Sequence, residues 1–127
     1  MLLADEQLVA FAATTDGARS IAFYTKVLGL TLRYEDDFAV SLEANGIELR
    51  LQKLTEFTPH PFTALGWQVG DIKTIVRKLV RRGVPLEMYP WMEQDEAGLW
   101  RAPGGALVAW FKDPDGNLLS VAQYPAD

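Results

Sequence analysis

The chain has 127 residues, a formal net charge of −5 and no cysteine. This length fits one domain with its own core, and the lack of cysteine excludes disulfides, thiolate metal sites and a cysteine nucleophile and favours the reducing cytoplasm. The acidic balance argues against a nucleic-acid partner and favours an uncharged or cationic small ligand. The segment MLLADEQ lacks the regions of a signal peptide, and no apolar run approaches the roughly 20 residues of a membrane-spanning helix, so we expect neither export nor a membrane partner.

The same order of structural signals occurs twice, in residues 8–54 and 62–123. Each half begins with a predicted strand, LVAFAATTD or TALGWQVGD, whose final aspartate stands where a helix N-cap accepts a backbone amide. A predicted helix then runs from Asp16 to Gly29 in the first half and from Asp71 to Gly83 in the second, since glycine commonly follows the last helical turn. The chain therefore carries an internal repeat.

The second predicted helix has one apolar stripe and one basic face. Its apolar residues recur at helical spacing, which predicts that the helix packs on a sheet; they are Ile72, Ile75, Val76, Leu79 and Val80. The opposite face carries Lys73, Arg77, Lys78, Arg81 and Arg82. Such a face is either an anion-binding patch or, more commonly, the solvated side of an amphipathic helix.

Three strands are expected after each helix. One restarts at the glycine, in GLTL and in GVPL, and a hairpin follows around Asn45-Gly46 in the first half and Asp115-Gly116 in the second. This order predicts an α+β fold of two βαβββ modules in a single domain of residues 1–127, with helices outside curved mixed sheets that enclose a cavity. Strand alternation places small and polar residues, among them Gln68 and Ser120, on the face away from the helices.

The segment Asp113-Pro114-Asp115-Gly116-Asn117 invites a calcium-loop interpretation. A calcium loop of the EF-hand type needs a glutamate six residues after its glycine, where this chain has Ala122, so a hairpin turn is the better interpretation. The single histidine, His60, lies between prolines and is interpreted as a solvated loop residue rather than a general base.

Paired βαβββ halves with FYTKVLGLTL after the first helix cap and FKDPDGNLLSV near the end resemble the vicinal oxygen chelate superfamily, which includes glyoxalase I, extradiol dioxygenases, fosfomycin-resistance enzymes and bleomycin-resistance proteins. The resemblance implies the fold, since many chemistries share this scaffold. It also implies four metal-ligand positions, usually His, Gln or Glu. These positions fall on Val9, Ala64, Ser120 and Arg50, or on Glu48 instead of Arg50 if the strand register shifts by two.

The resemblance therefore predicts that the usual metal site is lost and that no cofactor is bound. In its place, Arg50 is either a grip for a ligand carboxylate or phosphate or the partner of an internal acid such as Glu48. Tyr34 and Ser41 are further polar candidates, but the sequence does not fix which face of their strands they occupy.

Aromatic residues suggest what the cavity binds. The resemblance places Trp110 at a substrate-contacting position, Trp100 lies in a strand-like edge after an acidic loop, and Phe11 shares a strand face with Val9. Aromatic walls bind flat or cationic ligands, although Trp110 and Trp100 would equally serve as core residues, and Trp67 is expected to do so. Residues 90–98 are interpreted as a loop over the cavity mouth.

Two functions remain open. The first is a metal-free protein that binds a small organic ligand through Phe11, Arg50, Gln68, Trp100, Trp110 and Ser120. The second is a glyoxalase-like lyase or isomerase, or a dioxygenase relative with an atypical site, in which Glu48 is the candidate base. Aromatic residues near Phe57, Phe62, Trp91 and Tyr124, together with relatives of this length, predict a homodimer.

Overall fold

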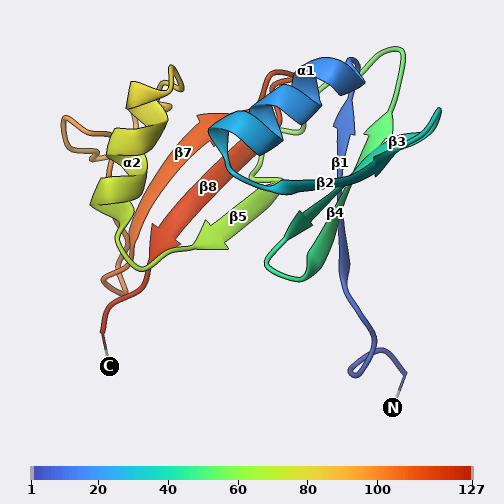
Figure 1. Cartoon of the computed structure of the whole chain (residues 1–127). Helices are drawn as coiled ribbons and strands as arrows, with labels where there is room; N and C mark the ends of the chain where they lie inside the picture. The colour runs from blue at the N-terminus through green and yellow to red at the C-terminus, as the bar shows by residue number, and fades with distance from the viewer. Residues whose placement is uncertain (1, 127) are drawn as a thin grey trace. The chain divides into compact units, whose positions relative to one another are not determined.

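A computed structural model of the chain describes residues 2–126. The chain forms two compact units, the first ending at Thr58 and the second beginning at Pro59. Each unit contains one four-stranded mixed sheet (Figure 1). No helix within the described residues is both long and apolar enough to cross a membrane.

The first unit follows the predicted βαβββ order. Its sheet has the strand order β1-β4-β3-β2, with β1 parallel to β4 and the other neighbours antiparallel. The predicted hairpin at Asn45-Gly46 joins β3 to β4, and both of these residues have positive φ. The elements are β1 (Val9–Thr14), α1 (Gly17–Ala22), η1 (Phe23–Val27), β2 (Thr31–Glu35), β3 (Ala39–Ala44) and β4 (Ile47–Lys53).

The second unit repeats this order, which confirms the predicted pair of βαβββ modules. Its sheet has the order β5-β8-β7-β6, again with one parallel pair, β5 and β8. The predicted turn around Asp115-Gly116 joins β7 to β8. The elements are β5 (Leu65–Gln68), α2 (Ile72–Arg81), β6 (Trp100–Arg101), β7 (Leu107–Lys112) and β8 (Leu118–Gln123).

One predicted strand is wrong. The GVPL segment after Gly83 forms no strand, and the strand that completes the module is the two-residue β6 much later in the chain. Pro85 has no backbone N–H to donate to a ladder, which weakens strand pairing at this point. Just after this segment, the Glu87 amide donates a hydrogen bond of 2.8 Å to the Trp110 carbonyl of β7.

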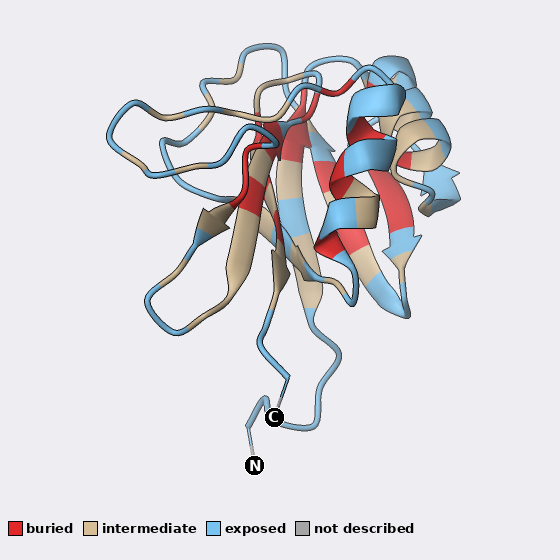
Figure 2. Ribbon diagram, turned by 90° about the vertical axis from the view of Figure 1, so that its left-hand side faces the viewer, coloured by how far each residue is buried: buried red, intermediate tan, exposed pale blue. Residues whose placement is uncertain are grey.

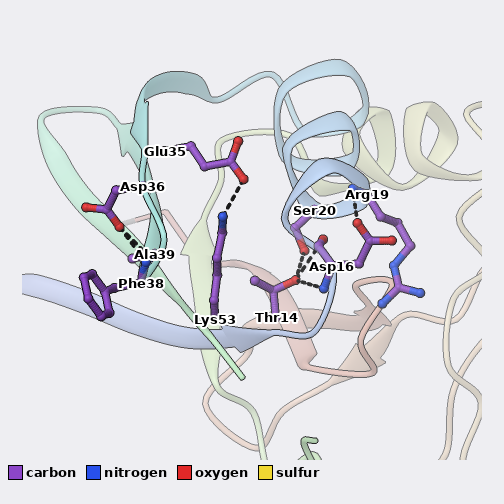
Figure 3. Close-up of polar contacts among 9 residues, drawn as sticks. All are labelled: Thr14, Asp16, Arg19, Ser20, Glu35, Asp36, Phe38, Ala39 and Lys53. Carbon is purple, nitrogen blue, oxygen red and sulfur yellow. Dashed lines mark hydrogen bonds and ion pairs between the residues drawn. The ribbon is translucent and has the colours of Figure 1, made fainter. Parts of the chain in front are cut away.

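Both predicted helix N-caps are confirmed. A carboxylate oxygen of Asp16 accepts the Arg19 amide at 3.1 Å, and one of Asp71 accepts the Thr74 amide at 3.2 Å. In the first unit, the Thr14 and Ser20 hydroxyls lie 2.7 Å apart and join the end of β1 to α1 (Figure 3). These local contacts explain why each helix begins where the aspartate predicts.

The first helix departs from the predicted regular helix. It continues from α1 into the π-helical turn η1, in which the Leu28 amide donates to the Phe23 carbonyl at 3.1 Å. The Thr25 hydroxyl donates to the Ile21 carbonyl at 2.7 Å and so competes for an acceptor of the regular helical ladder.

The core of each unit lies mainly on one face of its sheet. In the first unit, Leu49 and Leu51 of β4 alternate with more accessible residues, whereas the four residues 39–42 of β3 are all buried. In the second unit, α2 contacts β7 and β8. The buried apolar residues of this unit include Ile72, Val76, Leu79, Ala109, Phe111, Leu119 and Val121, and Figure 2 shows the buried stretches of the ribbon in red. Val80, predicted to belong to the apolar stripe of α2, is 56% exposed, and the expected core residue Trp67 is only half-buried.

Candidate functional site

The face of the second sheet that carries the even-numbered residues of β7 and β8 is the candidate binding surface. Register places Gly66, Ser120 and Trp110 side by side across three strands, and Gln68 lies on the same face one pair along. A Cβ atom on Gly66 would lie 2.8 Å from the Ser120 hydroxyl, so glycine lets this hydroxyl approach the backbone of β5 closely. The small residues Gly66 and Ser120 leave space above the sheet beside the ring of Trp110.

Four rings gather on this face and form what we call the aromatic cluster: Tyr89, Trp91, Trp100 and Trp110. The ring of Tyr89 lies 5.0 Å from that of Trp91 and 5.9 Å from that of Trp110, which it meets edge-on. The rings of Trp100 and Trp110 are also 5.9 Å apart. The indole N–H of Trp110 donates to the Thr63 hydroxyl at 3.1 Å, which fixes the orientation of this ring. These separations are typical of favourable aromatic pairs.

A pocket of about 630 Å³ opens beside the aromatic cluster. Its walls combine three rings of the cluster, those of Tyr89, Trp91 and Trp110, with the segment that enters β5 and with the turn between β7 and β8. The lining residues are Pro59, His60, Pro61, Phe62, Thr63, Tyr89, Trp91, Met92, Trp110, Lys112, Gly116 and Leu118. All of them belong to the second unit.

The loop that carries Tyr89 and Trp91 is held by the side-chain amide of Gln94. Its oxygen accepts the Tyr89 amide at 2.7 Å, and its nitrogen donates to the Glu87 carbonyl at 2.9 Å and to the Gly98 carbonyl at 3.0 Å. One side chain therefore replaces three backbone partners that a regular strand would supply. Trp91 and Met92, which belong to the segment predicted as a loop over the cavity mouth, line the pocket.

The Asp113–Asn117 segment is a turn, as predicted, and it also shapes the pocket. Asp113 is buried and accepts hydrogen bonds from the Asn117 amide at 2.9 Å and the Asn117 side chain at 2.7 Å. Gly116 has a φ of 88°, and a Cβ atom on it would lie 2.9 Å from Pro59. The turn thereby brings Gly116 and Pro59 together in one wall.

The first unit carries a polar group on the corresponding face of its own sheet. Register aligns Phe11, Arg50 and Ser41 across β1, β4 and β3. The Arg50 guanidinium donates to the Tyr34 hydroxyl at 2.7 Å and lies 3.9 Å from the Glu48 carboxylate. The buried Ser41 hydroxyl donates to Glu48 at 2.6 Å. Arg50 thus has internal partners, and one oxygen of Glu48 is already occupied.

The strand pairing relates Glu48 and Arg50 to positions of the second unit. Val9 pairs with Glu48, and Phe11, two residues on, pairs with Arg50. In the second unit the Ala64 amide donates to the Leu118 carbonyl, and Gly66, two residues on, pairs with Ser120. Arg50 is therefore the equivalent of Ser120 in the repeat.

The residues at the four implied metal-ligand positions do not fit a divalent metal. Val9 and Ala64 have no side-chain donor, and Arg50 is a cation. Ser120 offers only a neutral hydroxyl, a poor ligand for such an ion. Within residues 2–126, no group of three or more His, Asp or Glu side chains is arranged to hold a metal ion.

Among the predicted site residues, the structure brings Trp100 and Trp110 into contact and places Gln68 and Ser120 on the same sheet face. It groups Phe11, Glu48 and Arg50 on the sheet of the first unit. His60 is exposed, as predicted, and its ring stacks on Phe62 at 5.1 Å. Sequence reasoning missed further pocket residues, chiefly Tyr89, Thr63 and Lys112. The outward-facing position of Lys112, two residues after Trp110, could have identified it.

Known proteins resemble this chain both in sequence pattern and in structure. A family model of the Glyoxalase/Bleomycin resistance protein/Dioxygenase superfamily matches residues 7–121. A search of curated proteins found no match. Among solved structures, the chain is similar to a glyoxalase/bleomycin resistance protein/dioxygenase from Alicyclobacillus acidocaldarius, with 21% identity, a TM-score of 0.72 and coverage of 100% of this chain and 97% of that chain.

Two further structures extend the comparison. TnmS3, an antibiotic binding protein from Streptomyces sp. CB03234, has 18% identity and a TM-score of 0.69, with 98% of this chain and 100% of that chain covered. FosX, a fosfomycin resistance protein from Listeria monocytogenes, has 12% identity and a TM-score of 0.73, with 93% and 92% covered. At these identities the structural similarity supports the fold, and the family model matches most of the chain. The chain therefore belongs to the glyoxalase/bleomycin resistance protein/dioxygenase superfamily.

Proposed function

We propose that the chain binds a small planar organic molecule in the pocket beside the aromatic cluster, without a metal ion. The observation that carries this proposal is the pocket of about 630 Å³ lined by Phe62, Tyr89, Trp91 and Trp110. Its volume falls within the range of roughly 300–1,000 Å³ that is common for small-molecule sites. The antibiotic binding protein TnmS3 shares the fold.

The aromatic rings of the pocket lining supply the affinity. Trp91 is 76% exposed and Phe62 is 59% exposed, so a ligand that covers these rings removes apolar surface from water. Ring stacking adds about 0.5–1.5 kcal/mol per pair beyond this burial. Trp110 is held by Thr63 and by its contact with Trp100, so little side-chain entropy is lost when the ligand binds.

The other predicted ligand residues do not line this pocket. Ser120 and Gln68 offer polar groups on the same sheet face as Trp110, whereas Phe11 and Arg50 belong to the first unit. An enzymatic role with Glu48 as base is the weaker alternative, because Ser41 occupies one carboxylate oxygen and a base must reach a substrate proton.

The metal-independent part of the proposal rests on the side chains at the implied ligand positions, since Val9, Ala64 and Arg50 cannot donate electron pairs to a cation. Two measurements test whether the protein binds a metal ion. They are elemental analysis of the purified protein and thermal melting with and without zinc, nickel, manganese and iron. We expect no stoichiometric ion and no metal-dependent shift in melting temperature. A bound ion near one per chain would overturn this part.

Calorimetric titration with 2-naphthol, a neutral planar probe, tests the binding function in metal-free buffer. We expect saturable binding that weakens by about tenfold in Trp110→Ala, equivalent to about 1.4 kcal/mol. Trp67→Phe is the matched control because Trp67 lies on the other face of the same sheet. Equal binding by the wild type and Trp110→Ala would contradict the proposal.

We also propose a homodimer and a cytoplasmic location. The dimer is supported by the ring of Tyr124, which is 57% exposed and lies outside the pocket lining. The location is supported by the absence of cysteine from the sequence. Sedimentation that shows a monomer at high micromolar concentration would exclude the dimer.

A further inference from the structure

The polar side chains of the pocket share one chemical character. They come from His60, Thr63, Tyr89 and Lys112, and no carboxylate belongs to the lining. The Thr63 hydroxyl already accepts the indole N–H of Trp110, so its own hydrogen is free to be donated to a ligand. The pocket therefore presents mainly hydrogen-bond donors.

Lys112 is the cation of this group. Its ammonium nitrogen lies 3.5 Å from the Glu87 carboxylate, beyond the usual length of a charge-assisted hydrogen bond, and its side chain is 52% exposed. Such a pair is weak, and an ammonium group has three donors. Lys112 can therefore bind a second anionic group without leaving Glu87.

Tyr89 also favours an anionic group in the pocket, as a hydrogen-bond donor. Its burial raises the pKa of its phenol above the ordinary value, and the negative charge of Glu87 raises it further. The phenol is therefore neutral at physiological pH and can donate a hydrogen bond. Its ring meanwhile contacts both Trp91 and Trp110.

We propose that the ligand is a planar aromatic acid, whose ring packs on Trp91 and Trp110 while its carboxylate binds Lys112. This inference rests on the proposed function, and it replaces the expectation of an uncharged or cationic ligand that the net charge of −5 suggested. Salt screens charges over about 8–10 Å, so the cation in the wall has more influence on the ligand than acids elsewhere on the chain.

Calorimetric titration with two probes of the same ring system, the 2-naphthoate anion and neutral 2-naphthol at about pH 7, tests the charge preference. We expect the intact protein to bind 2-naphthoate about fivefold more tightly than 2-naphthol. Lys112→Met should remove this preference by lowering the affinity for 2-naphthoate. Glu87→Gln should increase the preference, because Glu87 lies outside the pocket lining and its negative charge competes with the ligand carboxylate for Lys112.

Lys73→Met is the matched control, because Lys73 is an exposed lysine of α2 outside the pocket lining. It should leave the preference unchanged. Raising the salt from about 0.05 M to about 1 M should reduce the preference in the intact protein, a test that needs no variant. If 2-naphthol binds but 2-naphthoate binds no more tightly, the inference is wrong and the proposed function stands. If neither probe binds, the proposed function itself is wrong.

Discussion

A guanidinium nitrogen of Arg50 lies 2.7 Å from the Tyr34 hydroxyl, although 16 residues separate the two. The register of β2 against β3 shifts between Leu32 and Tyr34, and this irregularity places Tyr34 opposite Ser41. Ser41 in turn lies opposite Arg50. Tyr34, Ser41 and Arg50 therefore lie in one row across β2, β3 and β4. The register shift in β2 places the Tyr34 phenol within reach of the Arg50 guanidinium.

The Arg50–Tyr34 contact predicts a measurable coupling. In a double-mutant cycle with Tyr34→Phe and Arg50→Met, we expect a coupling of about 1 kcal/mol in the free energy of unfolding, since the bond involves a charged group but is partly exposed. Urea denaturation measures it. The neighbouring Arg33→Met, combined with Tyr34→Phe, is the control and should be additive. Additive effects in the Arg50 cycle would show that the contact does not stabilise the unit.

The turn between β7 and β8 should depend on Asp113. Replacement by alanine leaves the amide and side-chain donors of Asn117 without this partner in a buried position, so we expect the free energy of unfolding to fall by about 2–4 kcal/mol. The urea midpoint at unchanged slope measures the loss. Asp37→Ala, at an exposed position, should change stability by less than about 0.5 kcal/mol. Similar effects of the two substitutions would refute this role.

Gly116 should resist substitution more than Gly104. Gly116→Ala forces an L-residue into a φ of 88° and towards Pro59, which should cost about 1–2 kcal/mol of stability. Gly104 has open space around its Cα and no positive φ, so Gly104→Ala should change stability by less than about 0.5 kcal/mol. Thermal melting compares them. Equal melting temperatures of the two variants would mean that the turn between β7 and β8 accommodates alanine at position 116 without strain.

The N-cap of α2 should make stability depend on pH in the acid range. The Thr74 hydroxyl, 2.8 Å from the Asp71 carboxylate, is the main reason that the pKa of Asp71 lies below its usual value, and the Thr74 amide adds to it. The ionised cap therefore stabilises the folded chain above the ordinary aspartate pKa of about 3.9, and the contribution disappears as the pH falls through the lower folded value.

Thr74→Val tests this assignment, because it removes the hydroxyl donor and keeps the backbone amide. The pKa of Asp71, followed by carboxyl carbon NMR, should rise towards its usual value in the variant. Asp71→Asn should flatten the acid dependence of stability that the cap contributes. An unchanged Asp71 pKa in Thr74→Val would assign the shift to another group.

Local signals predicted most of the fold. The aspartate caps and the Asn45-Gly46 and Asp115-Gly116 turns act within a few residues, so their sequence patterns predicted the elements correctly. The strand expected in GVPL failed because Pro85 cannot donate and because pairing is decided by a distant strand. The sequence also did not predict the π-helical turn, in which the Thr25 hydroxyl donates to the Ile21 carbonyl.

The candidate site was harder to predict. Trp110 and Ser120 could be placed on one face because strand alternation is strict between two hairpin strands. Tyr34 could not, because the register shift in β2 changes the alternation. Tyr89 belongs to a loop whose shape depends on Gln94, and no local pattern marks a side-chain amide that replaces backbone partners.

The central claim is that a planar ligand binds against Trp91 and Trp110, and the four indole N–H signals in an amide NMR spectrum test it most directly. Each signal can be assigned by a single Trp→Phe variant, and 2-naphthoate is then titrated in the presence of a chelator. We predict saturable shifts of the Trp91 and Trp110 signals and little change at Trp67, on the other face of the sheet. A shift confined to Trp67, or no saturable shift of any indole, would contradict the account.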